Sequence, residues 1–289
     1  MSGIQIIPAQ SGGLKLPLAP AQILQIPPQA QCLEVDPEGN IFLLYSEEGL
    51  LRKYLAESAY DSAIMVGGRG SRQEGLLHPI RISAQNRQNI FLLDDEAGKL
   101  LMFNINLRLL DQWDIWELTQ VESWESSGVE MQPVDFVMSP LGDRYLLNSL
   151  DNKLYKLNVY GKLETVFGGL DYGEGSLRQP TQLRINARNQ LFVSDFFRGQ
   201  KQLKVYDLYG IFSFAYTPTA PPDWQSFFVQ GKWLFLWNDT TLWIEDMRQR
   251  EVQQMELSFP SALKDLSFSG EVLYLLWENE VHLYRIDRK

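Results

Sequence analysis

A spacing that recurs along the chain limits its possible folds more than any other feature. In three segments, 79–94, 133–148 and 180–195, a proline is followed 15 positions later by Asp or Asn. Each segment contains a short alternating stretch, a polar turn and an apolar stretch, which is the pattern of a β-hairpin. Three copies of one hairpin indicate a repeat architecture.

Less regular copies of the hairpin occupy 32–45, 227–237 and 266–276. A third apolar stretch follows each hairpin, and a fourth follows most of them, for example at 163–169. Four strands in a unit of about 40–50 residues are typical of a propeller blade. We therefore predict an all-β fold, a six-bladed β-propeller with four-stranded antiparallel blades, in a single domain spanning 1–289. A count of five or seven blades stays open because the two late copies are the least regular.

The two ends of the chain suggest how the ring closes. The last copy has only three strands before the chain stops at Lys289, and a strand-like segment at 4–8 precedes the first copy. We predict that this N-terminal strand joins the last blade as its outer strand, which removes an exposed sheet edge. Deletion of residues 1–10 should then destabilise the whole ring.

Composition narrows the classes of partner. The chain has 26 Lys+Arg against 36 Asp+Glu, a net charge of −10, and no basic run. A nucleic-acid-binding surface needs a basic footprint, so we expect no nucleic acid partner. No stretch approaches the ~20 apolar residues of a membrane span, so we expect no direct membrane insertion. The single Cys32 excludes an internal disulfide.

The N-terminal sequence does not decide the cellular compartment of the protein. The start Met1-Ser2-Gly3 carries no basic leader, but it is also what the removal of a leader would leave. Divergent, acidic, Trp-rich propellers of this kind favour, by analogy, the bacterial periplasm or cell envelope over the cytoplasm.

Two segments resemble the NHL-repeat family of β-propellers. Both have a Gly-rich turn (66–70 and 166–169), a step into proline (77–79 and 179–180) and a strand that ends in Asp (92–94 and 192–195). The motif covers about a third of the chain, and it implies the fold more strongly than a function. The family includes scaffolds, RNA-binding modules, sensor ectodomains and a metal-dependent lyase.

No catalytic constellation stands out. The two histidines, His78 and His282, are fewer than a histidine-based catalytic zinc site needs. Metal ligands for a lactonase-like channel site would be Glu34, Asp135 and Asn186, but they do not share a repeat position. Cys32 has no evident histidine partner for nucleophilic catalysis. We therefore assign no catalytic residue, no metal and no cofactor.

Polar residues recur where strands end and begin. Those at strand ends are expected to accept backbone N–H bonds in the turn that follows the strand: Asp94, Asn148, Asp195 and Asn238. Residues two positions after the aligned prolines fall near one mouth of the central channel. They are Arg81, Asp135 and Gln182, with Cys32, Gln225 and Lys264 at the corresponding places of the other copies. This set either binds a peptide or small polar ligand, or Arg81 and Asp135 pair and close the mouth.

Eight tryptophans fall into two groups. Four lie in strand patterns and are expected in the core between blades: Trp233, Trp237, Trp243 and Trp277. Trp113, Trp116 and Trp124 lie in the long irregular stretch 111–133. Exposed aromatic residues on loops are favoured interface anchors, so this stretch is a candidate partner-binding loop, unless its indoles pack back on the propeller.

The leading hypothesis is a non-enzymatic scaffold that binds a protein or peptide, as a monomer within a bacterial envelope-associated assembly. One alternative is a propeller hydrolase, lactonase or lyase with a metal site at the channel. The other is a ligand-sensing domain of a larger signalling system.

Overall fold

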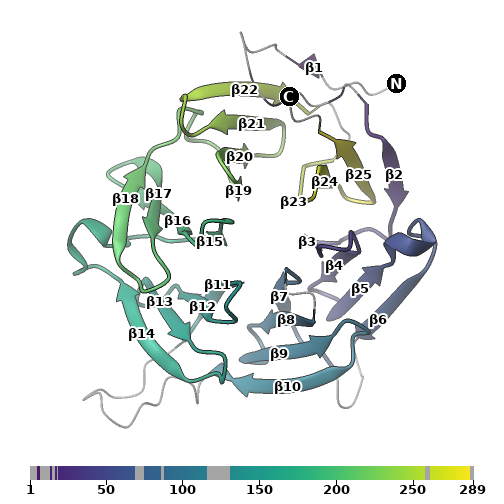
Figure 1. The fold of residues 1–289 in the computed structure, drawn as a ribbon, viewed down its shortest axis with the longest axis horizontal. Coiled ribbons are helices and arrows are strands. Elements are labelled where there is room, and N and C mark those ends of the chain that lie inside the picture. Colours follow the sequence, from purple (N-terminus) through teal and green to yellow (C-terminus); the bar gives the residue numbers. More distant parts are fainter. Residues whose placement is uncertain are drawn as a thin grey trace. The chain divides into compact units, whose positions relative to one another are not determined.

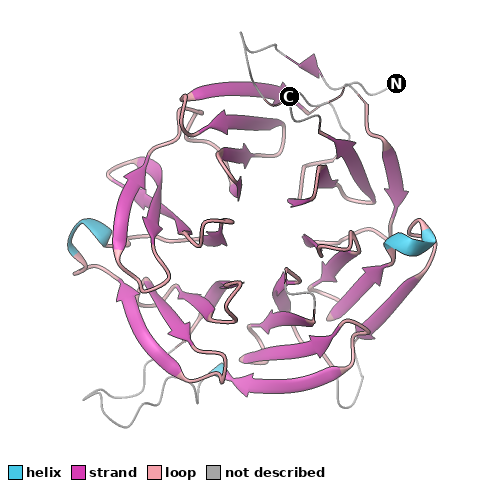
Figure 2. Cartoon of the chain, in the orientation of Figure 1, coloured by secondary structure: helices cyan, strands magenta, loops and turns pink. Residues whose placement is uncertain are grey.

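The computed structural model describes residues 5–6, 14, 17, 19–68, 75–85, 88–115, 131–257 and 261–286. These residues form an all-β fold of six four-stranded antiparallel blades, the six-bladed β-propeller predicted from the repeat (Figure 1). Two short 3-10 turns, η1 (Ala56–Ser58) and η2 (Gly173–Gly175), are drawn cyan in Figure 2, and Ile115 is also helical. None of the described residues forms a helix with the length and apolarity that crossing a bilayer requires.

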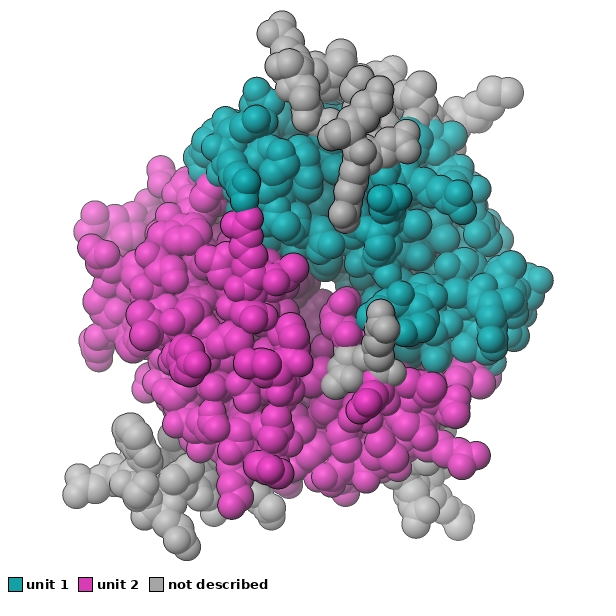
Figure 3. All heavy atoms as spheres, viewed as in Figure 1, with its two compact units in different colours: residues 1–45, 52–63, 218–289 teal, residues 46–51, 64–217 magenta. Residues whose placement is uncertain are grey.

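The chain divides into two compact units, coloured separately in Figure 3. Unit 1 comprises Met1–Tyr45, Arg52–Ala63 and Pro218–Lys289, and unit 2 comprises Ser46–Leu51 and Ile64–Thr217. The six predicted hairpins are the two inner strands of the six blades. A single domain over 1–289 stays a prediction.

Three complete blades belong to unit 2, each running from an inner to an outer strand. The first contains β7 (Pro79–Ser83), β8 (Asn89–Asp94), β9 (Lys99–Asn104) and β10 (Leu109–Asp114). The second contains β11 (Pro133–Met138), β12 (Arg144–Asn148), β13 (Lys153–Leu157) and β14 (Leu163–Gly168). The third contains β15 (Gln182–Ile185), β16 (Leu191–Phe197), β17 (Gln200–Tyr206) and β18 (Phe212–Tyr216). Inner strand β11 contacts both β7 and β15.

Two blades belong to unit 1, and a third sheet has strands in both units. The first blade of unit 1 contains β19 (Ser226–Gln230), β20 (Trp233–Trp237), β21 (Thr241–Asp246) and β22 (Glu251–Glu256). The second, which is the last blade of the chain, contains β23 (Asp265–Ser269), β24 (Val272–Leu276) and β25 (Glu280–Arg285). The shared sheet contains β3 (Cys32–Val35), β4 (Ile41–Tyr45), β5 (Leu50–Tyr54) and β6 (Ala63–Gly67).

The N-terminal region does complete the last blade, but not with the predicted segment. The outer strand there is β2 (Gln22–Gln25), which pairs with β25 from Gln22–Leu283 to Gln25–Glu280. Part of the predicted segment 4–8 forms β1 (Gln5–Ile6), which pairs with β22 as a fifth strand on the preceding blade. Strand β2 escaped prediction because it buries no residue, and Ile23 is exposed, so it has no apolar periodicity to detect.

Burial falls from the inner strands to the outer ones. All five residues of β12 are buried, whereas β10 buries none of its six. The second strand of each blade is covered on both faces by neighbouring blades, so its sequence is a continuous apolar run. Three of the four tryptophans expected in the core are buried, Trp237, Trp243 and Trp277, and Trp233 packs partly buried against the same cluster.

Six described hairpins share one five-residue turn. In each, the first residue donates a backbone N–H to the fifth and accepts one from the fourth. The fourth residue has positive φ, for example Gly161 at 78° and Gly210 at 86°, which is the geometry of a three-residue loop that ends in a bulge. The six turns span 36–40, 104–108, 139–143, 158–162, 186–190 and 207–211.

Candidate functional site

Two of the predicted channel-mouth residues of unit 2, Arg81 and Asp135, form a buried ion cluster with Arg184, which was not predicted. Arg81 Nε lies 2.6 Å from Asp135 Oδ1, and Arg184 Nη1 lies 2.8 Å from Oδ2. The backbone N–H groups of Phe136 and Leu183 donate to the same carboxylate, each at 2.8 Å. Asp135 has no exposed surface. It joins β7, β11 and β15, so the paired interpretation of Arg81 and Asp135 is confirmed.

The remaining channel-mouth assignments need a correction in register. The residue of β23 that corresponds to Asp135 is Asp265, since Asp265 pairs with Leu276 as Asp135 pairs with Leu147. Lys264 therefore lies one residue before the position that corresponds to Asp135. Its side chain is half exposed, and its Nζ lies 3.3 Å from Glu278 Oε2. By the same pairing the β19 residue is Ser226, not Gln225. A slip of one residue moves a side chain to the opposite face of a strand, so these two assignments were wrong.

Asp265 accepts in unit 1 the same two kinds of backbone hydrogen bond that Asp135 accepts in unit 2. Its Oδ1 accepts the N–H of Leu266 and its Oδ2 accepts the N–H of Leu33, both at 2.9 Å. This second bond joins the last blade to the first, where β23 also contacts β3. Gln182 is half-buried at the start of β15, and nothing described assigns it to a ligand site.

The recurring strand-end residues accept backbone hydrogen bonds, but only Asp94 and Asn238 accept them from the following turn, as predicted, whereas Asn148 and Asp195 accept them from the segment that leads into the first strand of their blade. Asp94 accepts the N–H groups of Leu77 and His78 that lead into β7, and also that of Ala97 in the following turn. Asn148, Asp195 and Asn238 likewise accept backbone N–H groups. The described residues contain no group of three or more His, Cys, Asp or Glu side chains placed to hold a metal.

Of the three predicted loop tryptophans, Trp113 is described and Trp116 and Trp124 lie outside the described residues. Trp113 does not lie in an irregular stretch, because β10 extends through Asp114. Its ring centroid lies 4.2 Å from the guanidinium carbon of Arg144, which also lies 4.9 Å from the centroid of Phe91. An added Cβ on Gly161 would come within 2.6 Å of the Trp113 indole nitrogen, so the indole lies against this turn.

A set of exposed apolar residues lies on the turns, which sequence reasoning missed. The third residue of the shared five-residue turn is its tip, and the six tips are Glu38, Asn106, Leu141, Tyr160, Arg188 and Tyr209. All are exposed, and Tyr160 and Tyr209 are 79% and 76% exposed. Because charged residues also occupy this position, the turn does not require an apolar tip.

The three apolar tips belong to adjacent blades of unit 2 and have apolar neighbours. Val159 precedes the Tyr160 tip, and Ile211 follows the Tyr209 tip; both are exposed. The Lys156 Nζ lies 5.6 Å from the Tyr209 ring, which places the third blade's turn beside the second blade. We call Leu141, Val159, Tyr160, Tyr209 and Ile211 the turn patch. Its sequence signal was the Tyr-Gly pair that recurs at 160–161 and 209–210.

The turn patch is part of an uneven surface. Among the described residues, fourteen of the fifteen large exposed hydrophobic side chains lie in unit 2, and Ile23 is the one in unit 1. Contiguous exposed apolar area on a soluble protein marks an interaction site more often than chance, whereas single exposed residues carry no such meaning.

Comparison with known proteins places the fold in a class without assigning a family. The fold is similar to that of a virginiamycin B lyase from Staphylococcus aureus, with 9% identity, a TM-score of 0.61 and coverage of 91% of this chain and 98% of that one. A gluconolactonase from Xanthomonas campestris gives 11% identity, a TM-score of 0.65 and 98% coverage of both chains. A chain of the mitotic checkpoint complex gives 8% identity, a TM-score of 0.59 and coverage of 97% of this chain and 96% of that one.

These low identities show a shared fold alone. No family model matches the sequence, and no curated protein matches it. The resemblance to NHL repeats therefore stays a prediction from the sequence.

Proposed function

We propose that this propeller binds a protein partner without catalysis, and that the turn patch of unit 2 is its contact surface. The observation that carries the proposal is the apolar identity of three tips where the turn geometry accepts charged residues equally well. Exposed tyrosines at such tips supply large contact area with few torsions to immobilise, which is why Tyr is enriched in binding hot spots.

The interior of unit 2 supports the same proposal. Asp135 is the most buried candidate ligand of the predicted channel mouth, and its carboxylate already accepts from two arginines and two backbone groups. A carboxylate used in this way holds three blades together. The candidate surface for a partner therefore lies at the turns.

The test is partner capture with three purified proteins. They are the wild type, the triple variant Leu141→Ser/Tyr160→Ser/Tyr209→Ser, and the control Leu150→Ser/Leu170→Ser. The control residues are also exposed but lie at the opposite ends of the strands in the β11–β14 blade. Extracts of the source cell, separated into envelope and cytoplasmic fractions, are cross-linked to each protein. The proposal predicts a stoichiometric partner that the wild type and control retain and the triple variant loses.

A second candidate function is an enzyme with a site at the channel, such as a lactonase or lyase. The fold likeness to a gluconolactonase and a virginiamycin B lyase favours it. Gluconolactone hydrolysis is followed by pH-stat with Ca²⁺, Mg²⁺ or Zn²⁺ added. Turnover well above the uncatalysed rate that persists in the triple variant would replace our proposal with this one.

A further inference from the structure

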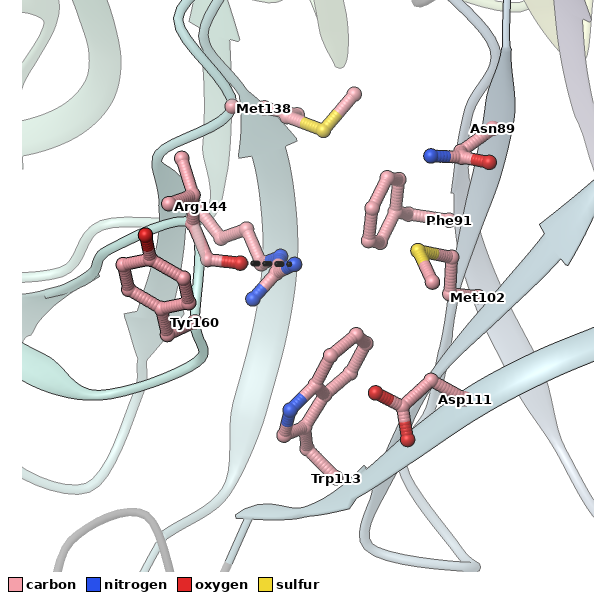
Figure 4. Close-up of a pocket in the computed structure, with 10 residues that line it drawn as sticks. Asn89, Phe91, Met102, Asp111, Trp113, Met138, Arg144 and Tyr160 are labelled. Atoms are coloured by element: carbon pink, nitrogen blue, oxygen red, sulfur yellow. Dashed lines mark hydrogen bonds between the residues drawn. The ribbon is translucent and has the colours of Figure 1, made fainter.

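A pocket of about 470 Å³ opens between two blades of unit 2, beside the turn patch. Its walls come from β8, β9 and β10 on one side and from β11, β12 and the 158–162 turn on the other (Figure 4). Most of the lining is apolar or aromatic, including Phe91, Met102, Trp113 and Met138. The volume lies within the range of about 300–1,000 Å³ that is typical of ligand sites.

One buried cation lies among these apolar walls. Arg144 is 3% exposed, and its guanidinium lies beside the rings of Phe91 and Trp113, facing both of them (Figure 4). Its two Nη atoms donate to the backbone oxygens of Asn158 and Val159, at 3.3 and 3.2 Å. Its Nε is shielded from solvent and has no acceptor among the residues that the structure describes.

The described part of the chain compensates this charge only in part. A guanidinium has five N–H donors, and two of them are used here. No carboxylate among the described residues forms an ion pair with Arg144, in contrast to Arg81 and Arg184, which share Asp135. Burial lowers the pKa of Arg144, and the charges of Asp111 and Asp143 act in the opposite direction. A buried charge without a paired counter-charge is costly, so this site favours an incoming anion.

We propose that the pocket receives an acidic side chain, flanked by apolar residues, from the protein partner. The carboxylate would accept from the remaining donors of Arg144, and the apolar neighbours would contact Phe91, Met102 and the edge of Trp113. Planar guanidinium groups suit carboxylates because of their fork of parallel donors. This inference rests on the proposed function.

Continuity with the turn patch identifies the source of the carboxylate. Val159 and Tyr160 belong to both the patch and the pocket wall, so one bound segment covers both. Asp111 is exposed and also lines the pocket, so its negative charge repels an incoming anion. Removing this charge is therefore a second test of anion binding.

If Arg144 has only a structural role, the binding experiments should give different results. In that case the arginine only holds the 158–162 turn and joins the two blades by stacking on Phe91 and Trp113. Its substitution would lower stability, but the pocket would not distinguish a carboxylate from an amide of the same shape.

The experiment uses two capped tripeptides, acetyl-Leu-Glu-Phe-amide and acetyl-Leu-Gln-Phe-amide, titrated into the full-length protein. Binding is followed by calorimetry and by the NMR signal of the Arg144 Nε–H, assigned through its loss in Arg144→Lys. We expect the Glu peptide to bind at least about tenfold more tightly than the Gln peptide and to shift that signal.

Two exposed carboxylates keep the test valid if Arg144→Lys fails to fold. Asp111→Asn should strengthen binding of the Glu peptide about two- to threefold because it removes a like charge from the rim. Asp171→Asn, on an exposed loop away from the pocket, should leave it unchanged. Equal binding of both peptides, or an Arg144 signal that does not move, would overturn the inference.

The remaining outcomes separate this inference from the proposed function. Benzoate binding as tightly as the Glu peptide would assign the pocket to a free small carboxylate and overturn the partner as its source. Failure of the Glu peptide, with partner capture still lost in the triple tip variant, would remove the inference and leave the proposed function standing. Glu-peptide binding at Arg144, with partner capture intact in the triple variant, would separate the pocket from the partner and overturn their connection.

Discussion

Two regions of unit 2 use their side chains in opposite ways. At the centre of the unit, Asp135 is completely buried and its oxygens accept from two arginines and two backbone N–H groups. At the turns, Tyr160 and Tyr209 are among the most exposed aromatic residues described, although the turn needs no aromatic residue there. The polar group that looked like a ligand site holds the fold together, whereas the residues that the fold does not require are available for a partner.

The largest effect is expected at the centre. Asp135→Ala leaves the guanidinium groups of Arg81 and Arg184 largely buried without their shared carboxylate. It should lower the free energy of unfolding by about 3–5 kcal/mol, as measured by urea denaturation. Asp171→Ala on an exposed loop is the control. A loss below ~1 kcal/mol would show that the cluster is not the clamp described above.

The next largest effect concerns the last blade of unit 1. Deletion of residues 1–25 removes β2 and its four residue pairs with β25, at an expected cost on the order of 2–4 kcal/mol. Deletion of residues 1–10 removes the two-residue β1 as its only described element and should cost less, whereas the sequence led us to expect destabilisation of the whole ring. Thermal melting of both truncations measures the difference. Equal melting temperatures would contradict the assignment of β2 as the outer strand.

In the 158–162 turn, substitutions of Asn158 and of the tip Tyr160 should have different effects, the first on stability and the second on partner binding. Asn158 Oδ1 accepts the N–H groups of Tyr160 and Lys162, so Asn158→Ala should cost about 1 kcal/mol. Tyr160→Ser should change stability by less than about 0.5 kcal/mol and weaken only partner binding. Chemical denaturation of the two variants tests this contrast. Strong destabilisation by Tyr160→Ser would mean that the tip serves the fold.

The smallest effect depends on pH and lies at the entry to β7. The hydrogen bond from His78 to Asp95 raises the pKa of His78 above its ordinary 6.5. The folded state then favours the protonated form, so this pair stabilises the protein below about pH 6.5 and loses its effect as the pH rises through the raised pKa. His78→Gln should slightly lower the melting temperature at pH 5.5 and leave it unchanged at pH 9. An equal loss at both pH values would assign the effect to packing.

The sequence predicted the parts of the fold whose signal is local. Buried second strands such as β12 are apolar runs bounded by Gly and Asn turns, so six hairpins and six blades could be recognised. Strand β2 could not, since an exposed edge strand has little apolar pattern. The Arg81–Asp135 pair was among the predicted alternatives because both residues align to one repeat position.

The candidate site was harder to predict for a physical reason. The Arg144 pocket joins residues of two blades, from Asn89 to Tyr160, and no repeat position connects them. The turn patch depends on exposure, which a strand pattern does not reveal. Trp113 lies in β10 and not in a loop, because β10 extends further than the polar residues of 111–114 suggested.

The most direct test of the turn patch uses a photo-crosslinking amino acid at equivalent turn tips. Benzoyl-phenylalanine replaces Tyr160 or Tyr209 in unit 2, and Glu38 or Arg188 in the matched controls, which have the same turn geometry. Irradiation in the source cells should give one shared adduct from positions 160 and 209 and none from 38 and 188. Equal adducts from all four tips, or none at 160 and 209 while the control tips react, would contradict a contact surface at the turn patch.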